Sequence, residues 1–145
     1  MDGQSPDQIH FHNHDLEYSL ENAEAISNWL SSVISSEKLR QGSLDFTFMS
    51  DDALLKINRE HLNHDFYTDI ITFEYNEEGL VSGDILISLD RIKDNAQELN
   101  NSLADELHRV LVHGVLHLCG YKDKTDSEQV EMRAKEDYYL SLRSF

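Results

Sequence analysis

The stretch from His113 to Asp123 constrains this chain more than any other part of its sequence. Two histidines four residues apart on a helix project from one face, about one turn apart, so both imidazoles can reach one ion. Gly120 suits the left-handed backbone position at which a helix ends, and the chain can then turn back and present the Asp123 carboxylate. Two imidazoles and one carboxylate are suitable zinc ligands that leave a position for water. The spacing therefore predicts a catalytic metal site formed by His113, His117 and Asp123.

The same residues also have purely structural explanations. Histidines four apart occur in helices that bind no ion, and an aspartate in a turn can bond to its own backbone. Zinc proteases with this spacing carry a glutamate directly after the first histidine as general base, whereas this chain has Gly114 there. Peptide hydrolysis is therefore disfavoured, and the attacking water needs activation by the metal or by another group.

Two further features could carry chemistry of their own: a set of histidines near the start of the chain and a single cysteine. A second candidate chelating set alternates along the start of the chain, at His10, His12 and His14. A solvated strand face is the more common outcome for such a pattern. Cys119 is the only cysteine, so it cannot form an internal disulfide and fits a reducing compartment. We interpret it as a small buried hydrophobe rather than as a nucleophile.

Length and composition indicate one compact domain. The chain has 145 residues, of which 39% are hydrophobic, with one proline and six glycines, as is typical of a globular, helix-rich domain. We expect a loose tail over residues 1–8 and a single metal-dependent hydrolase domain over residues 9–145. The sequence shows no secretory leader and no long apolar run, so we expect a cytoplasmic protein without a membrane partner.

Hydrophobic periodicity predicts an α+β fold, in which a single small mixed β-sheet packs against helices and the metal motif lies on a central buried helix. Strands are expected over residues 9–13, 42–49, 69–75 and 82–89, and the last two form a hairpin. Helices are expected over residues 20–36, 51–62, 91–99, 102–118 and from 125 onward. Helix caps are expected at Asp51, Asp52, Asp90 and Ser102, and as a capping box at Thr125 and Glu128.

Two apolar stripes at helical spacing predict which faces of the last two helices are buried. The stripe on the motif helix consists of Leu103, Leu107, Val110, Leu111, Gly114 and Leu118. The stripe on the last helix consists of Val130, Ala134, Tyr138 and Leu142.

The charge of the chain argues against strong autonomous binding to nucleic acid. Its 12 Lys and Arg against 28 Asp and Glu give a net charge of −16, which repels a polyanion at long range. A folded cleft could still gather four basic residues beside the metal, namely Lys56, Arg59, Lys122 and Lys124. We therefore expect weak RNA binding by the chain alone, with help from a protein partner or the ribosome.

The metal motif resembles the signature H-G-x-L-H-L-x-G-Y-D-H of the YbeY family, bacterial metal-dependent endoribonucleases that mature ribosomal RNA. It matches at His113, Gly114, Leu116, His117, Leu118, Gly120 and Tyr121. Residues 68–73 (T-D-I-I-T-F) and 83–88 (G-D-I-L-I-S) resemble two strands of that family. The resemblance implies hydrolysis of phosphodiester bonds during maturation of the small-subunit rRNA 3′ end and ribosome quality control, with one zinc ion per chain. It implies ribosomal RNA and the ribosome or its proteins as partners, and no DNA.

The chain departs from the family pattern at positions that bear on this chemistry. Asp123 stands where the family has its third histidine, and Lys122 stands where it has an aspartate. Tyr67 replaces a family proline. Leu62 replaces a family arginine that is expected to hold phosphate. A carboxylate ligand lowers the net positive charge of the site, so bound water becomes less acidic and oxygen-preferring divalent ions become more competitive.

The resemblance and the spacing together suggest the remaining site residues. Arg59 lies three residues before Leu62 and is the expected substitute for the family arginine. The candidate substrate cleft consists of Arg59, Thr68, Asp69 and Lys122. Arg59 and Asp84 are candidates for a catalytic role, with Glu106 and Glu128 as alternatives. Two other functions stay open, a non-catalytic ribosome-assembly factor with a structural metal and a metal-dependent hydrolase of another substrate.

Overall fold

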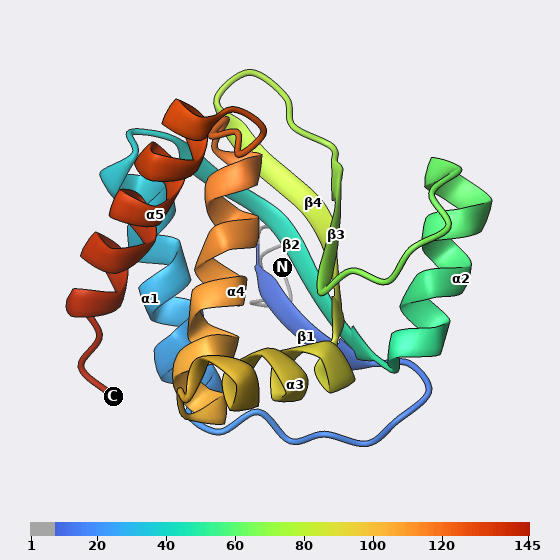
Figure 1. Cartoon of the computed structure of the whole chain (residues 1–145). Coiled ribbons are helices and arrows are strands. Elements are labelled where there is room, and N and C mark those ends of the chain that lie inside the picture. Colours follow the sequence, from blue (N-terminus) through green and yellow to red (C-terminus); the bar gives the residue numbers. More distant parts are fainter. Residues whose placement is uncertain (1–7) are drawn as a thin grey trace, which may run out of the picture.

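The computed structural model describes residues 8–145, so the expected tail lies almost wholly outside the described residues. One four-stranded sheet has the order β1-β2-β4-β3. Its strands are β1 (Ile9–Asn13), β2 (Arg40–Met49), β3 (Ile70–Glu74) and β4 (Leu80–Ser88). β1, β2 and β4 are parallel and β3 is antiparallel to β4, its hairpin partner. The mixed sheet confirms the predicted fold class (Figure 1).

The helices are α1 (Ala23–Ser36), α2 (Asp51–Leu62), α3 (Leu89–Leu99), α4 (Leu103–Leu118) and α5 (Asp126–Ser141). The motif helix α4 packs on β3 and β4 and contacts α1, α3 and α5, so it is central as predicted. Figure 1 shows α4 in front of the sheet, with α1 and α5 on one side of it and α2 on the other. Within residues 8–145, no helix has the length and apolarity that a membrane span needs.

The close approach of α4 to the sheet depends on Gly114. A Cβ added to Gly114 would lie 3.0 Å from Cδ1 of Ile70 on β3 and 3.1 Å from Cγ2 of Ile85 on β4. Those contacts are tighter than ordinary van der Waals packing, so a larger side chain would push the helix away from the strands. The predicted stripe around Gly114 is buried at Leu107, Val110, Leu111 and Leu118 and partly buried at Leu103.

The predicted stripe on α5 is wrong. Its members face solvent, with exposed fractions of 71% for Val130, 55% for Tyr138 and 54% for Leu142, and Ala134 is exposed too. The buried face consists of Met132, Glu136 and Tyr139. A charged residue occupies the centre of this face because its carboxylate is fully paired inside the protein, and apolar periodicity cannot anticipate such a residue.

The predicted caps of two helices, α2 and α3, are also wrong. Serine hydroxyls cap α2 and α3: Ser50 accepts from the Ala53 N–H, and Ser88 accepts from the Arg91 N–H. The aspartates expected to cap these helices lie one or two residues inside them. Ser102 caps α4, and the predicted capping box opens α5.

Candidate metal centre

The end of α4 brings the two histidines and Asp123 together. His113 and His117 occupy the last turns of α4, which ends at Leu118. Gly120 then adopts a φ of 109°, a positive value that favours glycine, and the chain reverses toward the histidines. Asp123 lies in the short loop before α5, so one short stretch of the chain carries all three side chains.

The three side chains converge on one point. The Nε2 atoms of His113 and His117 each lie 3.3 Å from Oδ2 of Asp123. One ligand atom from each residue can be chosen so that all three lie within 4.8 Å of one another. Ligand atoms about 2 Å from a tetrahedral ion lie about 3.3 Å from each other, so the donor set and its spacing fit a divalent ion.

Among the described residues, this is the only group of three or more His, Cys, Asp or Glu side chains that could hold an ion. His10, His12 and His14 are exposed on and beyond β1. His12 bonds to Asp45 on the neighbouring strand, with 2.8 Å between Nε2 and Oδ1. The histidines of β1 therefore form no second chelating group.

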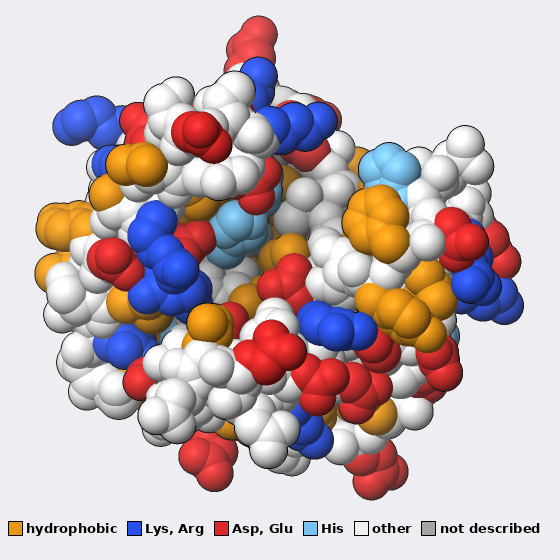
Figure 2. Space-filling view, viewed as in Figure 1, with side chains coloured by type: hydrophobic (Ala, Val, Ile, Leu, Met, Phe, Trp, Pro, Cys, Tyr) orange, Lys and Arg blue, Asp and Glu red, His pale blue; other side chains and the backbone are white. Residues whose placement is uncertain are grey.

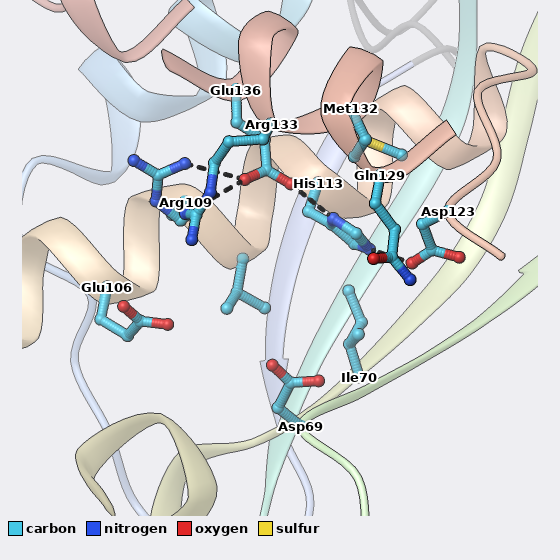
Figure 3. Close-up of a pocket in the computed structure, with 11 residues that line it drawn as sticks. Asp69, Ile70, Glu106, Arg109, His113, Asp123, Gln129, Met132, Arg133 and Glu136 are labelled. Carbon is cyan, nitrogen blue, oxygen red and sulfur yellow. Dashed lines mark hydrogen bonds and ion pairs between the residues drawn. The ribbon is translucent and has the colours of Figure 1, made fainter. Parts of the chain in front are cut away.

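Glu136 on α5 orients the first histidine. Its Oε2 lies 2.6 Å from Nδ1 of His113, while its Oε1 accepts from Arg109 at 2.8 Å. Arg109 also donates to Asp137 at 2.7 Å. Figure 3 shows this chain of contacts from Arg109 through Glu136 to His113. With Nδ1 donating to a carboxylate, Nε2 carries the lone pair that can bind an ion.

Pairing sets the charge of both groups in the absence of metal. Burial lowers the pKa of His113, but the hydrogen bond and charge of Glu136, with help from Asp123 and Asp69, outweigh burial and raise the pKa overall. Burial raises the pKa of Glu136, whereas the hydrogen bonds from His113 and Arg109 bring it below its ordinary value. Glu136 therefore stays ionised at neutral pH.

A second carboxylate network holds the loop that carries Asp123. The Tyr121 hydroxyl donates to Oε1 of Glu37 at 2.6 Å. The Tyr139 hydroxyl and the Lys135 ammonium, both on α5, donate to Oε2 of Glu37. One carboxylate beyond the end of α1 thus ties the metal-binding loop to α5.

The centre opens into a pocket of about 380 Å³. Arg109, Arg133 and Glu136 lie on one side of the pocket and Asp69 on the other, with His113 between them (Figure 3). In the space-filling view, pale-blue histidine is visible at the bottom of a hollow between a blue Lys and Arg group and an orange hydrophobic rim (Figure 2). Burial raises the pKa of Asp69, and the nearby His113 partly offsets this effect.

Comparison with known proteins identifies the family. The sequence model of the family described as "Endoribonuclease YbeY" matches residues 8–143. The chain belongs to the endoribonuclease YbeY family. It is 52% identical over 138 residues to an Endoribonuclease YbeY of Cytophaga hutchinsonii, covering 94% of this chain and 96% of that protein. It is 48% identical over 130 residues to one of Flavobacterium johnsoniae, covering 90% and 94% respectively.

A solved structure shares the fold of this chain. The solution structure of TM1509 from Thermotoga maritima superimposes with a TM-score of 0.65 at 26% sequence identity. The match covers 92% of this chain and 87% of that one. The resemblance of the motif to the YbeY signature is therefore confirmed by the whole chain.

The structure brings some of the predicted cleft residues of this YbeY protein to the pocket and not others. Asp69 lines the pocket, and Thr68 beside it donates to the Ile70 carbonyl at 3.4 Å. The exposed Arg59 side chain pairs with Asp65, and Lys122 is exposed. Neither Arg59 nor Lys122 is among the described residues that line the pocket.

The other residues considered for a catalytic role differ in where they lie and what they contact. Oδ2 of Asp84 accepts from the Tyr75 hydroxyl at 3.0 Å, and Glu128 accepts backbone N–H groups as part of the capping box. Glu106 is buried and lines the pocket. Burial raises the pKa of Cys119 to about 12, with a contribution from the charge of Glu37, as expected of a structural thiol rather than a nucleophile.

Three pocket residues escaped sequence reasoning: Arg109, Arg133 and Glu136. The one signal for Glu136 was its spacing from Met132 and Tyr139, which places all three on one helical face. Reading that signal requires knowing that Arg109 supplies the partner charge from another helix.

Proposed function

We propose that this chain is an endoribonuclease that cleaves ribosomal RNA with one divalent ion held by His113, His117 and Asp123. The observation that carries the proposal is the convergence of these three ligands at a pocket that also presents an arginine. Membership of the endoribonuclease YbeY family supports RNA as the substrate. We propose zinc as the ion because two ligands are imidazoles.

An ion at this centre supplies a Lewis acid, which lowers the pKa of water and offsets negative charge on the phosphate oxygens. Glu136 holds the His113 ring through Nδ1, so that Nε2 faces Asp123, where the ion would be held. Asp69 faces the same pocket, and burial raises its pKa. We assign Asp69 the role of accepting the proton of the attacking water, since a carboxylate with a raised pKa is a better base near neutral pH.

Arg133 is the residue that we assign to phosphate binding in place of the family arginine. Its contact with Glu136 is loose, with 4.0 Å between Nη1 and Oε1, and its side chain is 61% exposed. Arg109 in the same pocket makes two close ion pairs instead. Arg133 therefore has guanidinium donors to offer to a substrate, and a guanidinium suits phosphate geometry.

Replacing Arg133 by glutamine is expected to lower kcat/KM for RNA about 10- to 100-fold, mainly through KM, because one charge-assisted contact is lost. Steady-state cleavage of a labelled RNA measures this effect. Arg133→Lys should retain part of the activity, since it keeps the charge. Arg40→Gln is the matched control, because Arg40 is exposed on β2 and bonds to the Glu78 carbonyl. Equal KM values for Arg133→Gln and wild type would refute the assignment.

The experiment that tests the proposed function is metal removal and restoration. Elemental analysis of the purified protein should find about one zinc per chain, and a chelator should abolish cleavage of small-subunit rRNA precursors. Zinc, manganese and magnesium are then added back separately, because the Asp123 ligand lets oxygen-preferring ions compete. Undiminished cleavage by metal-free protein would contradict the proposal, and so would the absence of cleavage with every ion.

We propose that the ribosome or a ribosomal protein delivers the substrate, at the 3′ end of the small-subunit rRNA. The net charge of −16 opposes long-range attraction of free RNA. Action on ribosomal RNA supports our proposal that the protein works in the cytoplasm.

A further inference from the structure

The loop that ends at Asp69, which lies across the pocket from Arg133 (Figure 3), carries exposed aromatic side chains. We call residues 63–69, which connect α2 to β3, the aromatic loop. Phe66 is 55% exposed and Tyr67 is 49% exposed, although large aromatic rings are normally buried. Figure 2 shows hydrophobic side chains and a histidine gathered on one rim of the hollow, across from a Lys and Arg group.

Each exposed ring has one stacking partner and keeps about half of its surface open. The His64 ring stacks on Phe66, with 5.2 Å between centroids and 22° between planes. The Arg91 guanidinium lies 5.4 Å from the centroid of the Tyr67 ring. These partners fix the orientation of the rings, and they provide the aromatic and cation–π environment in which a further flat group stacks well.

The backbone of the aromatic loop is anchored to the core. The side chain of Asn58, only 2% exposed, donates to the Phe66 carbonyl at 2.9 Å. At the other end of the loop, the buried Ser88 donates its N–H to the Asp69 carbonyl at 2.9 Å. The rings are therefore displayed on a fixed backbone, which lowers the entropy lost when a ligand binds.

The aromatic loop continues directly into the metal pocket. Tyr67 precedes Asp69 by two residues, at most about 7 Å of extended chain, and Asp69 lines the pocket with His113 and Asp123. A protein partner needs an interface of about 800 Å² on each side, whereas this surface consists of a few side chains. Base stacking on aromatic rings needs only one ring per base, and every base has a flat face that can stack.

We propose that Phe66 and Tyr67 form a stacking surface for the bases of single-stranded RNA next to the cleaved bond. The surface supplies affinity that the acidic chain cannot obtain from charge. It lies in the loop in which Tyr67 replaces the family proline, directly after Leu62, which replaces the family arginine at the end of α2. The inference rests on the proposed function for its choice of RNA.

The test measures binding of a fluorescent single-stranded RNA decamer to chelator-treated protein, so that cleavage does not interfere. Phe66→Ala and Tyr67→Ala should each weaken the Kd about tenfold, which is typical of losing one base stack. Tyr67→Phe should bind like wild type, because it keeps the ring. Tyr138→Ala is the matched control, since Tyr138 is 55% exposed on α5, which lies on the opposite side of α4 from α2 (Figure 1).

Three further readouts distinguish the loss of base stacking from a change in charge contacts and from misfolding. The slope of log Kd against log salt should not change in the alanine variants, because a lost ring releases no counterions. Duplex RNA, whose bases are already stacked, should bind all variants alike. Thermal unfolding followed by circular dichroism checks that each variant is folded.

The outcomes distinguish this inference from the proposed function. If folded Phe66→Ala and Tyr67→Ala bind the decamer as wild type does, the stacking surface is refuted even when the wild type cleaves RNA. If binding depends on the rings but no ion restores cleavage, the proposed function fails and the surface stands. A changed salt slope would also overturn the inference.

Discussion

Replacing His117 by alanine is expected to abolish metal binding and RNA cleavage together while leaving the protein folded. His117 contributes one of three ligands, and its side chain is 28% exposed, so its loss removes little core packing. Without the ion, several kcal/mol of charge stabilisation are lost, which corresponds to about a thousandfold or more in kcat. Elemental analysis and cleavage of labelled RNA by the same preparation measure both effects.

His10→Ala provides the matched control for this variant. His10 is an exposed histidine on β1, so the substitution changes the same chemical group without touching the candidate centre. Zinc content and cleavage should stay at wild-type values in the control. RNA cleavage that survives in both His113→Ala and His117→Ala, with circular dichroism showing a folded chain, would rule out the metal mechanism.

The substitution Glu136→Ala should weaken both the fold and the metal site. Glu136 is buried and bridges Arg109 and His113. Removing it leaves Arg109 without its closest buried partner, which costs about 3 kcal/mol or more in the free energy of unfolding. It also frees the His113 ring, and loss of such an orienting carboxylate lowers metal affinity about 10- to 100-fold. Urea unfolding of the metal-free protein and zinc titration measure the two effects separately.

A conservative variant separates orientation from charge. Glu136→Gln keeps the size of the side chain and can still accept a hydrogen bond from Arg109, so it should be more stable than Glu136→Ala yet lose metal affinity. Wild-type metal affinity in both Glu136 variants would refute the orienting role.

The ionised Glu136 also makes the stability of the fold depend on pH. Because its folded-state pKa lies below the ordinary 4.5, its contribution is present above pH 4.5 and is lost as the pH falls below that value.

The part of the centre that could be predicted is the part that local sequence determines. His113, His117 and Asp123 lie within eleven residues, and helix geometry with a reversal at Gly120 fixes their relative positions. Glu136 and Arg133 reach the same pocket from α5, and Asp69 reaches it from the loop before β3. These contacts between distant parts of the chain depend on how the helices pack on the sheet, which apolar periodicity does not specify.

The fold was predictable to a similar extent. Strand and helix positions follow apolar periodicity, since most buried positions carry apolar side chains. On α5 the rule fails because Glu136 occupies a buried position and apolar residues such as Val130 lie outside. The failure occurs on the face of the helix where the buried charge of Glu136 pairs with His113, one of the three candidate metal ligands.

The two carboxylate networks on α5 have a consequence for the order in which the enzyme becomes competent during synthesis. All three ligands leave the ribosome before α5 does, yet the partners that orient His113 and hold the Asp123 loop, Glu136 and Tyr139, belong to α5. A nascent chain that has reached Asp123 therefore carries the ligands without the supports that arrange them. We therefore expect tight capture of an ion only after α5 has docked, because Glu136 and Tyr139 reach their partners only then.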